Sequence, residues 1–304
     1  MCGGIIREFP SDFYGGTVSA DDPRKWANDK RDKTARYVRD LGPLIARASA
    51  ALTPGVPVAA HCGFAVNGSR KSNTTGWLSC SADERAEALR EGRKPLGGDP
   101  RAGYGAVNSN DLHELGPWGV EGNRVPELVA SGSCPWASLA TSDGVRAVLG
   151  RDGATGAGWY DDVDAQVVIG VANLARHSRL MNAKLPAALR WDDAAPWTLW
   201  RWFLTSMAWS AGEGGTARHV GRYIADLSAA SEASRVAVFA RCASTYDGDG
   251  RKHARPSYSV LRTLQKIAAG SLAATIANDA AALAWLRVDI DDATIAALVR
   301  SASA

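Results

Sequence analysis

The chain has 304 residues, a formal net charge of +3, and 46% hydrophobic and 22% charged residues. This balance is typical of a folded globular protein and excludes an intrinsically disordered chain. So small a positive charge does not indicate a nucleic-acid-binding protein. Polar residues break every apolar run well before the roughly 18 residues that a transmembrane helix needs, so we expect a soluble protein with no membrane span.

The five cysteines are odd in number, and no two of them form a C-x-x-C motif. This pattern predicts free thiols in a reducing compartment rather than a disulfide framework or a structural zinc site. The sequence therefore predicts no metal and no cofactor. The first sixteen residues lack the basic stretch and long apolar run of a secretion signal, so we expect synthesis in the cytoplasm without export by the general secretory route.

The first third of the chain is predicted to contain two helices after a polar lead-in. Residues 1–33 are rich in Gly, Asp and Lys and are predicted to form an irregular N-terminal arm. From Thr34 to Leu52 apolar residues recur at helical spacing, and a Thr-Pro-Gly turn ends that helix. A short apolar helix is predicted from Pro57 to about Val66, where Asn67-Gly68-Ser69 ends it.

The middle of the chain differs in composition from both ends. Residues 68–160 carry Gly clusters, paired polar residues and isolated Trp, which predicts a loop- and hairpin-rich insertion. Helical periodicity returns over residues 162–181 and 197–211. Further helices are predicted over 216–227, 232–243, 258–269, 272–286 and 292–301. An Asp-Gly-Asp-Gly turn suggests that a main domain of residues 34–246 is followed by a C-terminal helical extension, residues 247–304.

The stretch from Asp162 to Cys242 resembles the second half of the lysozyme-like fold, in its goose-type lysozyme and lytic transglycosylase branch. In that family a helix under the cleft is followed by a hydrophobic helix that ends in a turn of the form A-Y-N-A-G-x-G-x-V. Here the turn reads Ala208-Trp209-Ser210-Ala211-Gly212-Glu213-Gly214-Gly215. The segment from Gly55 to Val66 is similar to the family's first helix, and Gly116 to Glu121 is similar to its G-x-x-Q hairpin.

The resemblance implies a mainly α, lysozyme-like α+β fold, with a helical core and a loop- and hairpin-rich lobe. It also implies a peptidoglycan-cleaving glycosidase or lytic transglycosylase that uses a Glu as general acid and binds glycan strands. In the absence of a secretion signal, we expect such an enzyme to reach the cell wall as a phage endolysin or as a virion component that contacts phage tail or virion proteins.

Two carboxylates are the main candidates for the general acid, whose pKa must be raised by partial burial. Glu114 lies between Leu112 and Leu115, and Glu121 stands at the hairpin position where the family often has Gln. Glu213 is a third candidate, because a carboxylate at a helix C-terminus could have a raised pKa, but an exposed carboxylate in the turn is the favoured interpretation.

Four residues are predicted to bind the sugar. Trp118, in a loop, is the candidate for stacking, because Trp is well suited to hold sugar rings. The resemblance adds Trp209 and Ser210 at the turn, and Asn67 at the position of the family's catalytic Glu. By contrast, His61, His177 and His219 have no carboxylate or Cys at catalytic spacing and are predicted to be structural, as are Trp197 and Trp200.

A second hypothesis follows from Asn67. An amide cannot donate and retrieve a proton as a carboxylic acid does. The chain could therefore be a catalytically inactive structural or interaction protein of a phage particle, built on a lysozyme-like scaffold.

Overall fold

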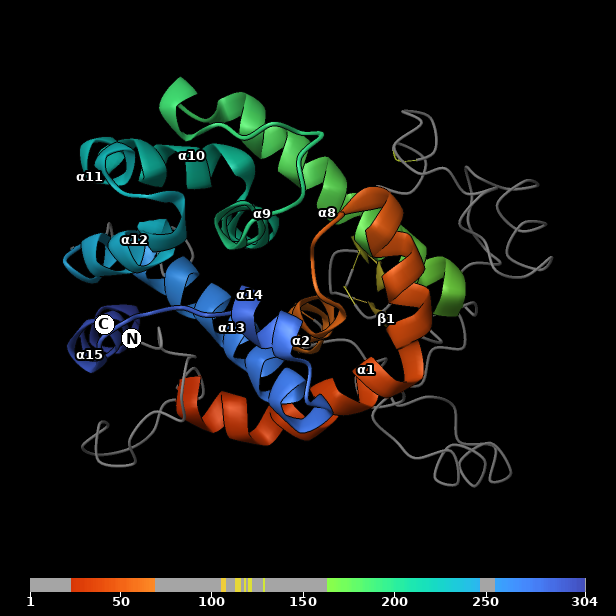
Figure 1. Ribbon diagram of the computed structural model, residues 1–304. Helices are drawn as coiled ribbons and strands as arrows, with labels where there is room; N and C mark the ends of the chain where they lie inside the picture. Colours follow the sequence, from red (N-terminus) through yellow and green to blue (C-terminus); the bar gives the residue numbers. More distant parts are fainter. Residues whose placement is uncertain are drawn as a thin grey trace, which may run out of the picture.

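The structure is a computed structural model that describes residues 23–68, 105–107, 113–115, 118, 120–121, 128, 163–246 and 255–303. This part of the chain is mainly α-helical, as the sequence predicts. The helices pack in an irregular bundle, with a small sheet beside it (Figure 1). None of the helices described is long and apolar enough to cross a membrane.

The centre of the bundle is α13 (Pro256–Ala277), which packs against α2 (Val58–Gly68) and α1 (Pro23–Leu52) (Figure 1). The crossing of α2 and α13 is close because both helices carry a glycine there. A Cβ atom on Gly63 would lie 2.4 Å from the carbonyl oxygen of Lys266, and one on Gly270 would lie 2.9 Å from that of Ala59. Neither position has room for any side chain.

The first helix, α1, borders this central pair. Its buried side chains recur at helical spacing, and they include Tyr37, Leu41, Ile45 and Ala48. Pro43 lies inside the helix, and proline removes a hydrogen bond and clashes with the preceding turn. We attribute the bend of α1 in Figure 1 to this proline.

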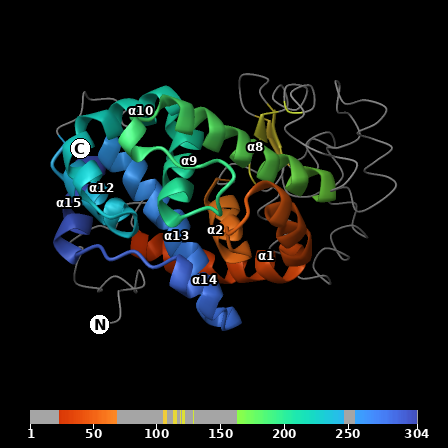
Figure 2. The ribbon, with the colours of Figure 1, turned by 45° about the horizontal axis from the view of Figure 1, so that its top comes forward.

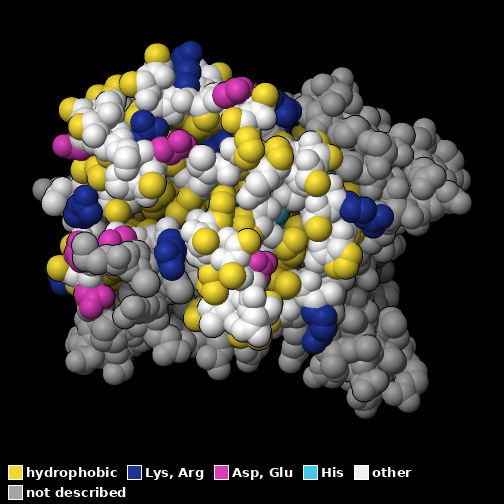
Figure 3. All heavy atoms as spheres, viewed as in Figure 1, with side chains coloured by type: hydrophobic (Ala, Val, Ile, Leu, Met, Phe, Trp, Pro, Cys, Tyr) yellow, Lys and Arg dark blue, Asp and Glu magenta, His cyan; other side chains and the backbone are white. Residues whose placement is uncertain are grey.

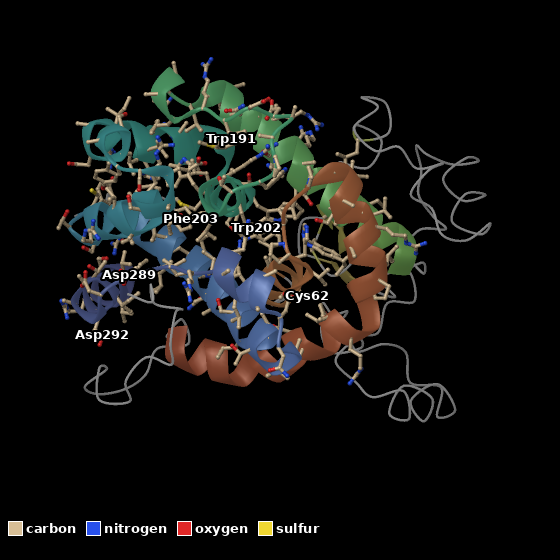
Figure 4. The ribbon with its side chains drawn as sticks, in the orientation of Figure 1. Cys62, Trp191, Trp202, Phe203, Asp289 and Asp292 are labelled. Carbon is tan, nitrogen blue, oxygen red and sulfur yellow. The ribbon has the colours of Figure 1, made fainter. Side chains whose placement is uncertain are left out.

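A second layer consists of α8 (Val163–Lys184) and α9 (Leu199–Ala211), which pack against each other. Val167, Val171 and Leu204 are all 0% exposed, which confirms the predicted helical faces. Trp202 and Phe203 extend from α9 into the interior of the molecule (Figure 4). The Thr198 side chain caps the N-terminus of α9 by accepting a hydrogen bond from the Arg201 amide.

The remaining helices complete the bundle. They are α10 (Glu213–Arg222), α11 (Ile224–Ala229), α12 (Arg235–Ser244), α14 (Ala280–Trp285) and α15 (Asp292–Ser303), with 3₁₀ turns at Ala187–Leu189 and Glu232–Ser234. α15 packs against both α12 and α13. Residues from the last part of the chain therefore lie beside elements far earlier in the sequence, as Gly270 of α13 lies beside Ala59 of α2, more than 200 positions before it.

Three short strands lie beside α8 (Figure 2). They are β1 (Gly105–Val107), β2 (His113–Leu115) and β3 (Val120–Glu121), paired antiparallel in the order β1-β2-β3. The hairpin predicted between Gly116 and Glu121 coincides with the β2–β3 connection. Most of the predicted insertion, residues 68–160, lies outside the described residues, and the lysozyme-like α+β fold stays a prediction.

The structure corrects three predictions about the ends of the chain. The predicted arm, residues 1–33, is helical from Pro23 onward, because α1 begins there. The described part of the predicted extension, residues 255–303, is mostly helical but is no appendage, since α13 supplies the central helix of the core. The two helices predicted over 258–269 and 272–286 meet without a break at residues 270–271, because α13 continues to Ala277 and Gly270 allows its close contact with α2.

Candidate functional site

The chain reverses sharply between α9 and α10, and this turn brings several polar and aromatic side chains together. Gly212 adopts a φ of 73°, a conformation that favours glycine, and α10 begins at the next residue. We call the group around this turn the Trp209 cluster. It consists of Phe64 from α2, His177 from α8, Trp209 and Ser210 from α9, Glu213 from α10, and Lys266 from α13.

Trp209 is the centre of the cluster and is partly buried. Its ring centroid lies 5.2 Å from that of Phe64, edge to face, and 5.1 Å from that of His177. Such aromatic contacts fix the orientation of a ring. Trp209 therefore joins α2, α8 and α9 at one point.

Glu213 and His177 form a hydrogen bond in which the His177 Nδ1 lies 2.7 Å from the Glu213 carboxylate. This hydrogen bond is the main reason why the pKa of Glu213 is lowered to about 2, and it outweighs the opposing effect of burial. Glu213 is the first residue of α10, so it stands at the positive end of a helix dipole rather than the negative one. The alternative of a raised pKa at Glu213 is therefore wrong.

Lys266 lies beneath the turn and is only 3% exposed. Its Nζ donates to the Ser206 carbonyl oxygen at 3.2 Å and to the exposed Ser210 Oγ at 3.4 Å, and it lies 4.1 Å from the centre of the Phe64 ring. Within the described part of the chain, no carboxylate forms an ion pair with it. Burial lowers the pKa of Lys266 to about 7, so a large neutral fraction exists at physiological pH.

The two predicted acids lie on neighbouring strands. Glu114 on β2 and Glu121 on β3 are Cα partners in the antiparallel register, so the fold brings these two positions together. Asn67 lies near the end of α2, three residues after Phe64. The side chains of Glu114, Glu121 and Asn67 lie outside what the structure describes.

Trp118 does not fit its predicted role. We expected a loop tryptophan that stacks on sugars, but its side chain is 1% exposed. The ring covers Gly170 of α8 so closely that a Cβ there would lie 2.6 Å from it. A ring buried against a helix presents no face to a sugar, so Trp118 holds the hairpin against α8.

Two of the histidines are structural, as predicted. His61 is fully buried, and its Nε2 lies 3.0 Å from Thr53 Oγ1 and 3.2 Å from Ser49 Oγ. Burial lowers the pKa of His61 to about 3, which keeps the ring neutral. His219 is buried as well. His177 is the exception, because Glu213 supplies the carboxylate that the sequence analysis did not assign to it.

A separate cavity of about 590 Å³ lies at the opposite end of α9. Trp197, Trp200 and Trp285 form its apolar walls, and Glu232, Arg287 and Asp289 are the charged residues that line it. Trp197 and Trp200 are buried, as predicted. Asp289 lies toward the α15 side of the molecule in Figure 4.

The described residues contain no group of three or more His, Cys, Asp or Glu side chains that could hold a metal ion. On the face of the molecule shown in Figure 3, the coloured Lys and Arg side chains are interspersed with Asp and Glu rather than gathered into one patch. Comparisons with known proteins give no further guide, because no family model, curated protein or solved structure matches the chain.

Proposed function

We propose that the chain cleaves the glycan strands of peptidoglycan, as a glycosidase or lytic transglycosylase that acts by general-acid catalysis from Glu114 or Glu121. The observation that carries this proposal is the meeting of three separate segments at Trp209. The end of α2, the helix α8 and the α9–α10 turn are the segments in which the resemblance lies, and Phe64, His177 and Trp209 join them.

The position of the strands adds support. Trp118 fixes the β2–β3 hairpin at Gly170, seven residues before His177 on the same helix. At 1.5 Å per residue this spacing is roughly 10 Å along α8. The strands with both candidate acids and the turn with Trp209 therefore lie against the same helix, about two turns apart.

The chemistry divides between two kinds of carboxyl group. The acid, Glu114 or Glu121, delivers a proton to the glycosidic oxygen as the bond breaks. Positive charge then develops on the sugar ring, and an ionised carboxylate nearby stabilises it. Glu213 suits this second role, because its low pKa keeps it ionised at neutral pH. A hydroxyl of the sugar itself closes the ring in a lytic transglycosylase, and water attacks in a hydrolase.

Mass spectrometry of the fragments released from purified peptidoglycan tests the proposal, because it separates hydrolytic from anhydro products. Glu114→Gln and Glu121→Gln are compared with the wild type. The acid variant should lose activity on the order of 100-fold or more, and the other variant should lose less. The matched control is Glu232→Gln, since Glu232 bonds to Thr198 at the far end of α9. Wild-type activity in both variants would exclude these acids.

A second candidate function is that of a catalytically inactive component of a phage particle. One observation favours it: Asn67 stands where the resemblance expects the catalytic Glu. If the wild type releases no fragments from peptidoglycan of several bacterial types, this alternative replaces the enzyme. Delivery as an endolysin or as a virion component belongs to the enzyme proposal, and fractionation of purified phage particles would distinguish the two routes.

A further inference from the structure

The Trp209 cluster contains one residue that glycan cleavage does not explain. Lys266 is buried without a carboxylate partner among the described residues, and burying an unpaired ammonium is costly. Lysines placed in this way are typical of sites where a neutral amine acts as a base. Its Nζ is also directed at one exposed hydroxyl, that of Ser210.

We propose that Ser210 and Lys266 form a nucleophile–base pair that cleaves a carboxylic ester. The geometry has the elements of such a pair: a solvent-exposed hydroxyl, an amine within 3.4 Å of it, and a desolvated amine environment. A Ser–Lys pair is a known variant of the serine nucleophile. This activity does not depend on whether the chain cleaves glycans.

The turn after Ser210 also offers a place for negative charge. The first N–H groups of α10 have no carbonyl partner within the helix and so attract an oxyanion. Gly214 and Gly215 leave open space there, since a Cβ on either would meet no atom within 4 Å. The nearest anion in the cluster, the Glu213 carboxylate, is held by His177 and so directed toward α8.

The proposed reaction has two steps. Neutral Lys266 takes the hydroxyl proton of Ser210 as its Oγ attacks the ester carbonyl; the C–O bond to the alcohol breaks, and the alcohol leaves with the proton from Lys266. In the second step water attacks the acyl-serine, and Lys266 takes its proton and returns it to Oγ as the carboxylic acid leaves. Water is the only co-reactant.

A fluorophosphonate probe tests the nucleophile directly, because it phosphonylates activated serines and needs no glycan. We expect the wild type to be labelled, with peptide mass spectrometry placing the label on Ser210. Lys266→Met should slow labelling on the order of 100-fold, the usual contribution of a general base. The matched controls, Ser228→Ala and Lys184→Met, change an exposed serine and an exposed lysine outside the cluster and should label as the wild type does.

The pH dependence of labelling provides a second readout. The wild-type rate should rise as Lys266 loses its proton around pH 7 and then level off, and Lys266→Met should lack this rise. The charged neighbour that also lowers the pKa of Lys266 is Arg262, one turn earlier on α13. Among the described groups of α2 and α9, the Lys266 Nζ contacts the Phe64 ring, the Ser206 carbonyl and the Ser210 hydroxyl. His177, which holds Glu213, contacts the Trp209 ring instead.

Three results would overturn the proposal. They are no labelling of the wild type above the level of Ser210→Ala, a label on another residue, or an unchanged rate in Lys266→Met. Circular dichroism and thermal unfolding of Lys266→Met show whether slower labelling results from loss of the folded structure rather than from loss of the base. Hydrolysis of p-nitrophenyl acetate, measured on the same set of variants, should follow the same order. Probe labelling and ester hydrolysis use no glycan, so both can be measured whether or not a variant cleaves peptidoglycan.

Discussion

At the scale of single residues, Lys266 is a basic side chain whose burial disfavours its charged form. Its pKa is lowered from 10.5 to about 7, chiefly by burial. At about 1.4 kcal/mol per pKa unit, the native state at neutral pH carries a cost on the order of 3–5 kcal/mol. We predict that Lys266→Met raises the free energy of unfolding, because Met fills similar space without a charge. Urea unfolding measures this, and the exposed Lys184→Met should have little effect.

The same prediction has a pH window. Between about pH 10.5 and pH 7 the unfolded chain holds the Lys266 proton and the folded chain does not. The wild type therefore loses stability as pH falls through this range, and this group changes nothing further below pH 7. The difference in Tm between Lys266→Met and the wild type should grow as pH falls toward 7 and then stay constant. A difference that is the same at all pH values would contradict the burial of the charge.

Glu213 gives a prediction of the opposite sign. Its pKa is lowered from 4.5 to about 2, so the ionised group stabilises the native state above pH 4.5 and this contribution is lost as pH falls toward 2. The pair with His177 is partly exposed, so we expect Glu213→Gln to cost only about 1 kcal/mol at neutral pH. Urea unfolding at several pH values should show this loss shrink at low pH, and a loss that is the same at all pH values would contradict the lowered pKa.

At the scale of elements, the crossing of α2 and α13 depends on glycine. We predict that Gly63→Ala destabilises the protein by about 2 kcal/mol or more, because the new Cβ would lie 2.4 Å from the backbone oxygen of Lys266. The control is Gly221→Ala on α10, where a Cβ meets no atom within 4 Å. There alanine should stabilise by roughly 0.5–1 kcal/mol through its helix propensity. Equal effects on Tm in the two variants would show that the helices can separate.

The same crossing shows what the sequence can and cannot predict about elements. The helices α8 and α9 were predicted to within a few residues, because their apolar faces repeat cleanly. The sequence predicts separate helices over 258–269 and 272–286, with Gly270 between them. From the sequence alone, a glycine that allows close helix packing cannot be distinguished from a glycine that ends a helix. Only the partner, Ala59 on α2, distinguishes the two cases, and that partner is more than 200 residues away.

For the candidate site as well, local features could be predicted from the sequence and long-range contacts could not. The turn with Trp209 and Ser210 was found from its local pattern. The contacts that give the turn its chemistry join residues 36 and 56 positions apart, His177 with Glu213 and Ser210 with Lys266. The prediction that Trp118 stacks on a sugar was wrong, because nothing in the sequence near Trp118 indicates that Gly170 accommodates its ring.

At the scale of the whole molecule, the last part of the chain completes a core that the earlier parts begin. α13 lies between α1, α2 and α9, and its apolar residues Val260, Leu264 and Ile267 are fully buried. The helices on either side cannot cover their apolar faces without it. Folding of residues 23–246 therefore requires residues that follow them in the chain.

We accordingly predict that a chain ending at residue 246 does not fold. Each fully buried aliphatic side chain of α13 contributes roughly 1.5–3 kcal/mol, and several together are comparable with the roughly 5–15 kcal/mol by which a typical domain is stable. The shortened chain should show no cooperative thermal transition by circular dichroism and should bind a hydrophobic dye. Adding a peptide of residues 247–304 should restore part of the transition, because it supplies the missing helix. A cooperative transition in the shortened chain alone would mean that residues 1–246 form a domain of their own and that α13 is dispensable to it.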